Sequence, residues 1–95
     1  MAIPYKIVQE PEFSAKIKRL ENLFPRTEDF MKGLYNILSY VPLDWGTPIP
    51  KEPSQKYGIY FVGESLEVGK FPPFKILYRV TDDCVYLISM GGIIM

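Results

Sequence analysis

The segment FKILYRVTDDCVYLISM, residues 74–90, decides the fold of this chain. Two runs rich in β-branched and aromatic residues, 74–80 and 84–90, flank the triplet TDD at 81–83, whose side chains favour a tight turn. The segment therefore predicts an antiparallel hairpin of two strands. A third strand is expected at 56–62, where tyrosine, isoleucine and phenylalanine are again frequent.

Two amphipathic helices are expected ahead of these strands. Apolar residues of the first recur at steps of four, three and four, which places them on one helix face: Phe13, Ile17, Leu20 and Phe24. Pro25 ends this helix, and Thr27 is the expected N-cap of a second helix that runs to Val41 and ends at Pro42. Because the turn between the helices is very short, they should form an antiparallel hairpin.

The remaining segments complete an α+β domain. Residues 5–9 (YKIVQ) alternate and predict a short strand. Residues 42–56 contain four prolines and predict an ordered loop, with a short edge strand at most and no helix, in which Trp45 covers one end of the core. The whole chain, 1–95, is thus expected to be a single domain: a strand, an antiparallel helix hairpin, then a three-stranded antiparallel sheet.

Composition excludes several classes of protein. The 95 residues carry 11 basic and 11 acidic side chains, whereas proteins that bind free nucleic acid usually show a basic excess. With no histidine and only Cys84 as a thiol, the chain has no usual zinc site, no internal disulfide and no histidine-dependent nucleophile. We expect no cofactor. The first residues resemble no signal peptide and no run is long and apolar enough to span a membrane, so we expect a cytoplasmic protein.

Two parts of the chain resemble one family. Residues 5–8, followed by Pro-Glu-Phe at 11–13, are similar to the start of the RelE/ParE toxin superfamily. Residues 74–80, with the Asp-Asp turn and the apolar last strand, resemble the hairpin of that family, and the likeness extends over residues 5 to 90. The resemblance implies the toxin of a type II toxin–antitoxin pair. Such a toxin binds an antitoxin protein and either cuts messenger RNA on the ribosome or poisons DNA gyrase.

The resemblance also nominates site residues. Cleavage of RNA requires cations to stabilise the charged phosphorane and an acid for the leaving oxygen. Lys75 matches the basic position of the family's hairpin, and Arg79 lies on the same side of its strand by period-two alternation. Lys56 is a further candidate cation. Tyr86 and Tyr60 are candidates for a weak acid or for stacking on a base, although tyrosines on strands more often serve packing.

A non-catalytic reading stays open beside the catalytic one. Ribonucleases of the family carry an arginine after the tyrosine of the second strand, whereas Gly58 stands here. They also carry a histidine-arginine pair after the last strand, where this chain has the apolar residues 90–95. A protein-binding module of the same fold is therefore the alternative, with its cations meeting antitoxin carboxylates or only solvating the sheet. The loop carboxylates Glu64 and Glu67 are weaker candidates for a general base, and the apolar tail is a candidate contact for a homodimer.

Overall fold

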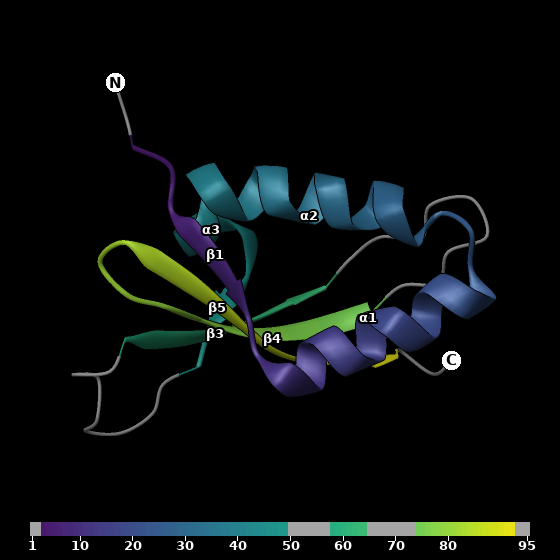
Figure 1. The fold of residues 1–95 in the computed structure, drawn as a ribbon. Helices are drawn as coiled ribbons and strands as arrows, with labels where there is room; N and C mark the ends of the chain where they lie inside the picture. Colours follow the sequence, from purple (N-terminus) through teal and green to yellow (C-terminus); the bar gives the residue numbers. More distant parts are fainter. Residues whose placement is uncertain (1–2, 50–57, 65–73, 93–95) are drawn as a thin grey trace.

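The computed structural model describes residues 3–49, 58–64 and 74–92 (Figure 1). Its elements follow the chain in this order: β1 (Lys6–Gln9), α1 (Pro11–Leu23), α2 (Thr27–Tyr40), α3 (Pro42–Trp45), β2 (Thr47–Pro48), β3 (Ile59–Glu64), β4 (Phe74–Val80) and β5 (Cys84–Gly92). The predicted α+β class is confirmed, and so is the order of a strand, two helices and a run of antiparallel strands.

The sheet is larger than the predicted three strands. It has five strands in the order β1-β5-β4-β3-β2, and the β3–β4 and β4–β5 pairs are antiparallel as predicted. The additional feature is β1, which pairs parallel with β5 and places Lys6 opposite Cys84. A parallel pair needs a long connection. The two helices and the strands after them supply this connection. The N-terminal strand β1 is therefore the edge strand on one side of a mixed sheet.

The proline-rich segment after α2 is partly regular. Pro42 begins the single turn α3, which corrects the expectation that residues 42–56 hold no helix. Proline is tolerated at the first helical position because its missing N–H would have no partner there. The expected short edge strand is present as β2, which pairs antiparallel with β3. Residues 50–57 lie outside the described part of the chain.

The core lies between the helices and one face of the sheet. Buried side chains of β4 alternate along the strand, so Phe74, Ile76, Tyr78 and Val80 face the helices. They join buried residues from α1, α2, β3 and β5 in one cluster: Phe13, Ile17, Leu20, Leu34, Leu38, Phe61, Val85, Leu87 and Met90. Figure 1 shows α2 lying over the sheet on this side. The odd-numbered residues of β4 therefore point to the opposite face, as predicted.

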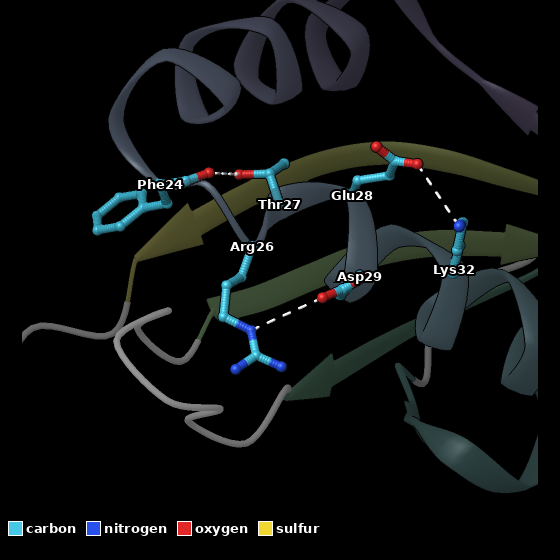
Figure 2. A network of polar contacts seen from close by, with 6 residues as sticks. All are labelled: Phe24, Arg26, Thr27, Glu28, Asp29 and Lys32. Carbon is cyan, nitrogen blue, oxygen red and sulfur yellow. Dashed lines mark hydrogen bonds and ion pairs between the residues drawn. The ribbon is translucent and has the colours of Figure 1, made fainter.

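The junction between the helices depends on a buried hydroxyl. Thr27 is the first residue of α2 and not its N-cap, a place taken by Arg26, so this prediction was wrong. The side chain is 1% exposed, and its hydroxyl lies 2.8 Å from the carbonyl oxygen of Phe24 and 3.1 Å from that of Leu20. Figure 2 shows the hydroxyl pointing back at the end of α1. It therefore fastens the start of the second helix to the end of the first.

The ion pairs around this junction contribute much less than the hydroxyl. Arg26 lies 3.7 Å from Asp29, and Lys32 lies 3.5 Å from Glu28 (Figure 2). All four side chains are more than half exposed, so solvent screens the pairs and each is worth less than about 1 kcal/mol.

Tyr78 connects the sheet to the α3 segment. Its ring is fully buried and stacks on Phe61, with centroids 5.2 Å apart. Its hydroxyl donates to the carbonyl oxygen of Pro42 at 2.6 Å and accepts from the Gly46 N–H at 2.9 Å. Burial raises the pKa of Tyr78 from 10.0 to about 12, against a smaller lowering by the Gly46 hydrogen bond. Trp45 packs on the Tyr78 ring, with the two ring centroids 5.8 Å apart, and covers this end of the core, as predicted.

We predict that Tyr78→Phe lowers the free energy of unfolding by about 1–3 kcal/mol, because two buried backbone groups lose their partner. Denaturant unfolding at neutral pH measures this loss, with Tyr40→Phe as a control on an exposed ring.

The pH dependence gives a second readout of the same side chain. Between pH 10 and about 12 the unfolded chain releases the Tyr78 proton while the native state keeps it. The stability of the native chain is therefore complete below pH 10 and falls as pH rises through this window. The Tyr78→Phe variant should lack this component, and an unchanged pH profile would contradict the assignment.

Two glycines provide a matched pair of substitutions. A Cβ at Gly63 would lie 2.1 Å from Cζ3 of Trp45, whereas a Cβ at Gly33 on α2 would meet nothing within 4 Å. Gly63→Ala should lose about 1–3 kcal/mol of stability and change the tryptophan fluorescence. Gly33→Ala should gain about 0.5–1 kcal/mol through its helix propensity. Equal effects of the two variants on denaturant midpoints would contradict this packing.

Candidate functional site

The predicted site residues that the structure describes lie on the face of the sheet opposite α1 and α2: Tyr60, Lys75, Arg79 and Tyr86. In the strand register Tyr60 of β3 lies opposite Arg79 of β4, which in turn lies opposite Tyr86 of β5. Val8 of β1 pairs with Tyr86 and extends the row to the edge of the sheet. Residues opposite one another in a sheet have neighbouring side chains. We call these four residues the cross-strand row.

Arg79 and Tyr86 are in direct contact within the row. The guanidinium carbon of Arg79 lies 4.3 Å from the centroid of the Tyr86 ring, a distance typical of a cation–π interaction. Both side chains are half-buried. Because the guanidinium of Arg79 packs on this ring, its positive charge lies close to the open face of the sheet, and the side chain does not extend into solvent.

Tyr86 has an altered acidity. Its pKa is raised above the ordinary value, first by a hydrogen bond with the Cys84 side chain and by the charge on that group. The guanidinium of Arg79 acts in the opposite direction. The Tyr86 hydroxyl is therefore a weaker acid than that of an ordinary tyrosine. Cys84 is thus the neighbour with the largest influence on the acidity of Tyr86.

Lys75 stands apart from the row, although it shares the same face. Arg79 lies four positions further along β4, which places their Cα atoms about 13 Å apart. The two cations therefore do not converge on a single phosphate. Lys75 instead pairs with Glu64, opposite it on β3, at 3.9 Å, and both side chains are more than half exposed. The expectation that Glu64 lies in a loop was wrong, because it is the last residue of β3 and pairs with Lys75 in the sheet, although its side chain is exposed.

Two further candidates cannot be placed. Lys56 and Glu67 lie in residues 50–57 and 65–73, outside the described part of the chain, and so does most of the apolar tail.

A β-bulge next to the row was not predicted. Tyr78 lies opposite Leu87 and Leu77 lies opposite Ser89, so Ile88 is an extra residue in β5. A bulge bends its strand and increases the local twist, and bulges are frequent beside functional sites. The sequence of β5 contains no glycine or proline before the tail that could have indicated it.

A groove between α1, α2 and β1 is a second feature that sequence reasoning missed. Its volume is about 700 Å³, and its mainly apolar and aromatic walls include these side chains: Tyr5, Ile17, Met31, Tyr35 and Tyr40. Gln9 at its border donates from Nε2 to the Tyr35 hydroxyl and accepts from the Ser14 hydroxyl, both at 2.8 Å. The three tyrosines were not recognised as a group because they lie far apart in the sequence.

Neither a metal site nor a membrane-spanning helix occurs among the described residues. No three histidine, cysteine, aspartate or glutamate side chains there are arranged to hold a metal ion. None of the helices described is long and apolar enough to cross a membrane.

The acidity of Tyr86 is predicted to respond with opposite signs to its two neighbours. Arg79→Gln should raise the Tyr86 pKa further, because it removes a neighbouring positive charge that lowers it. Cys84→Ala should lower this pKa, because it removes the largest cause of the increase. NMR titration of the tyrosine ring carbons measures both shifts. Lys75→Gln, at the far end of β4, serves as the control and should change nothing; shifts of one sign in both variants would contradict the geometry.

Comparison with known proteins adds no relative. No protein-family model matches this sequence, and no curated protein is significantly similar to it. What is established is a small α+β fold in which a strand and two helices precede a run of antiparallel strands, combined in one mixed sheet.

Proposed function

We propose that this chain is the toxin-like component of a type II toxin–antitoxin pair and that it engages messenger RNA in the cytoplasm through the open face of its sheet. The observation that carries the proposal is the cross-strand row, in which Arg79 lies between Tyr60 and Tyr86. Aromatic rings on an open sheet stack on unpaired bases, and a guanidinium binds phosphate. The element order agrees with the family that the sequence resembles.

The row supplies part of a ribonuclease. In this proposal Arg79 stabilises the negative charge that develops on a phosphorane, and the hydroxyl of Tyr86, which is in contact with Arg79, gives a proton to the leaving oxygen. None of the four residues in the row is a base, so the proton of the attacking 2′-hydroxyl passes to solvent or to a group that the ribosome supplies. The expected activity is therefore endonucleolytic cleavage that depends on the ribosome to position the message.

A non-catalytic protein-binding module is the second candidate function. Two observations favour it: the chain has no net charge, and Lys75 is already paired with Glu64. In this case Arg79 binds a carboxylate of an acidic antitoxin segment, an interaction that needs no base. The same surface then serves recognition alone.

The deciding experiment is regulated expression of the intact chain. Growth is followed together with the 5′ ends of ribosome-bound messages. A toxin should arrest growth and create new message ends, and Arg79→Gln should reduce cleavage by about 10²-fold, as loss of one charge-stabilising group does in other enzymes. Lys75→Gln should retain most of the activity, since Lys75 lies outside the row. Circular dichroism of both variants controls for folding.

Other outcomes separate the alternatives. Growth arrest without new message ends would show that the target is DNA gyrase or another molecule and not messenger RNA. Absence of any effect from a well-folded chain would exclude the toxin and leave the binding module.

A further inference from the structure

We propose that the free edge of β1, together with the groove beside it, binds an extended segment of a partner protein that carries a basic side chain. The site lies on the helix side of the sheet. It is therefore separate from the cross-strand row and does not depend on the function proposed above.

The first argument is the hydrogen bonding of β1. Lys6 N–H donates to the Asp83 carbonyl oxygen and Glu10 N–H donates to that of Leu87, both at 2.9 Å. In a parallel pair alternate residues face the neighbouring strand, so Ile7 and Gln9 direct their N–H and C=O groups away from β5. On the same edge the Tyr5 N–H already donates to the Ser39 carbonyl oxygen of α2 at 2.8 Å, whereas the groups of Ile7 and Gln9 pair with no described residue. They form a template on which an added strand can pair.

The opposite edge of the sheet offers no such template. It is β2, which has only two residues, and one of them, Pro48, has no N–H. A short edge strand with proline is a usual protection against strand addition. The other edge is β1, a strand of four residues that pairs with β5 on one side only. Of the two edges described, β1 is thus the one that can accept a strand.

The second argument is the groove along α2, which meets this edge at Gln9. Its volume of about 700 Å³ is within the range of sites that bind small molecules or peptide side chains. From Glu28 to Tyr40, both of which line it, α2 rises about 18 Å. An extended segment of about five or six residues has this length. Tyr40 is 60% exposed, so the aromatic end of the groove is open to a partner.

The third argument is the charge of the groove, because this charge determines which side chains of a partner can bind there. The charged side chains that line it are two carboxylates, Glu21 and Glu28, and one ammonium, Lys32. Lys32 is already paired with Glu28 at 3.5 Å, whereas Glu21 has no ion pair within the described residues. A lysine or arginine of the partner can pair with Glu21, and an acidic segment would be repelled. Apolar residues at alternate positions would face Ile17 and Met31.

The test uses random peptides of about seven residues, displayed on phage and selected on the immobilised intact chain. The expected peptides alternate apolar residues and contain lysine or arginine. A selected peptide, resynthesised, should slow hydrogen exchange at the Ile7 and Gln9 amides of the isotope-labelled chain. Glu21→Gln should weaken its affinity by about 5-fold or more. Glu12→Gln, an exposed carboxylate on α1 outside the groove, should leave the affinity unchanged.

Three results would overturn the proposal. The first is a selection that gives no peptides, or peptides without a basic residue. The second is binding that perturbs the amides around Arg79 and leaves those of Ile7 and Gln9 unchanged. The third is a dimer in sedimentation equilibrium with the same two amides protected, which would show that a second copy of the chain occupies the edge. None of these results bears on RNA cleavage by the open face.

Discussion

The two hydrogen bonds of the buried Tyr78 hydroxyl hold together the parts of the structure on which the rest depends. They connect the central strands to the α3 segment, which carries Trp45 over Gly63 and closes one end of the core. The next residue along the same strand is Arg79, which faces the other way. Because successive residues of a strand alternate between faces, a ring fixed in the core also fixes the guanidinium on the open side. The same strand, β4, therefore positions both a central residue of the core and the cation of the candidate site.

The molecule presents two surfaces of different chemistry. The open face has a supported cation between two tyrosines, and the groove beside β1 has tyrosines with an excess of carboxylate. Zero net charge of the whole chain therefore conceals local differences of sign. A phosphate or carboxylate is favoured on one surface and an ammonium or guanidinium on the other. Two partners of opposite character could bind together, because neither surface uses residues of the other.

Much of the fold followed from local patterns, and the errors have a common cause. The bounds of β4 were predicted to the residue because its side chains alternate clearly and a turn follows. Period-two alternation also placed Arg79 and Lys75 on one face. The parallel pairing of β1 with β5, the contacts of Thr27 and the groove were missed, since each joins residues distant in sequence or depends on how helices are packed. The separation of Lys75 from Arg79 was derivable from strand geometry alone, and the pairing of Lys75 with Glu64 required the register.

The pairing of β1 with β5 has a consequence for how the chain folds. Lys6 and Cys84 are 78 residues apart in sequence yet neighbours in the sheet. During synthesis the first strand and both helices leave the ribosome before the strand that completes their sheet exists. Contacts of such long range carry a high entropic cost and slow the folding reaction. The N-terminal strand must therefore wait, with its apolar side chains unpaired, until the last hairpin is made, and removal of β5 would release the beginning of the chain as well as its end.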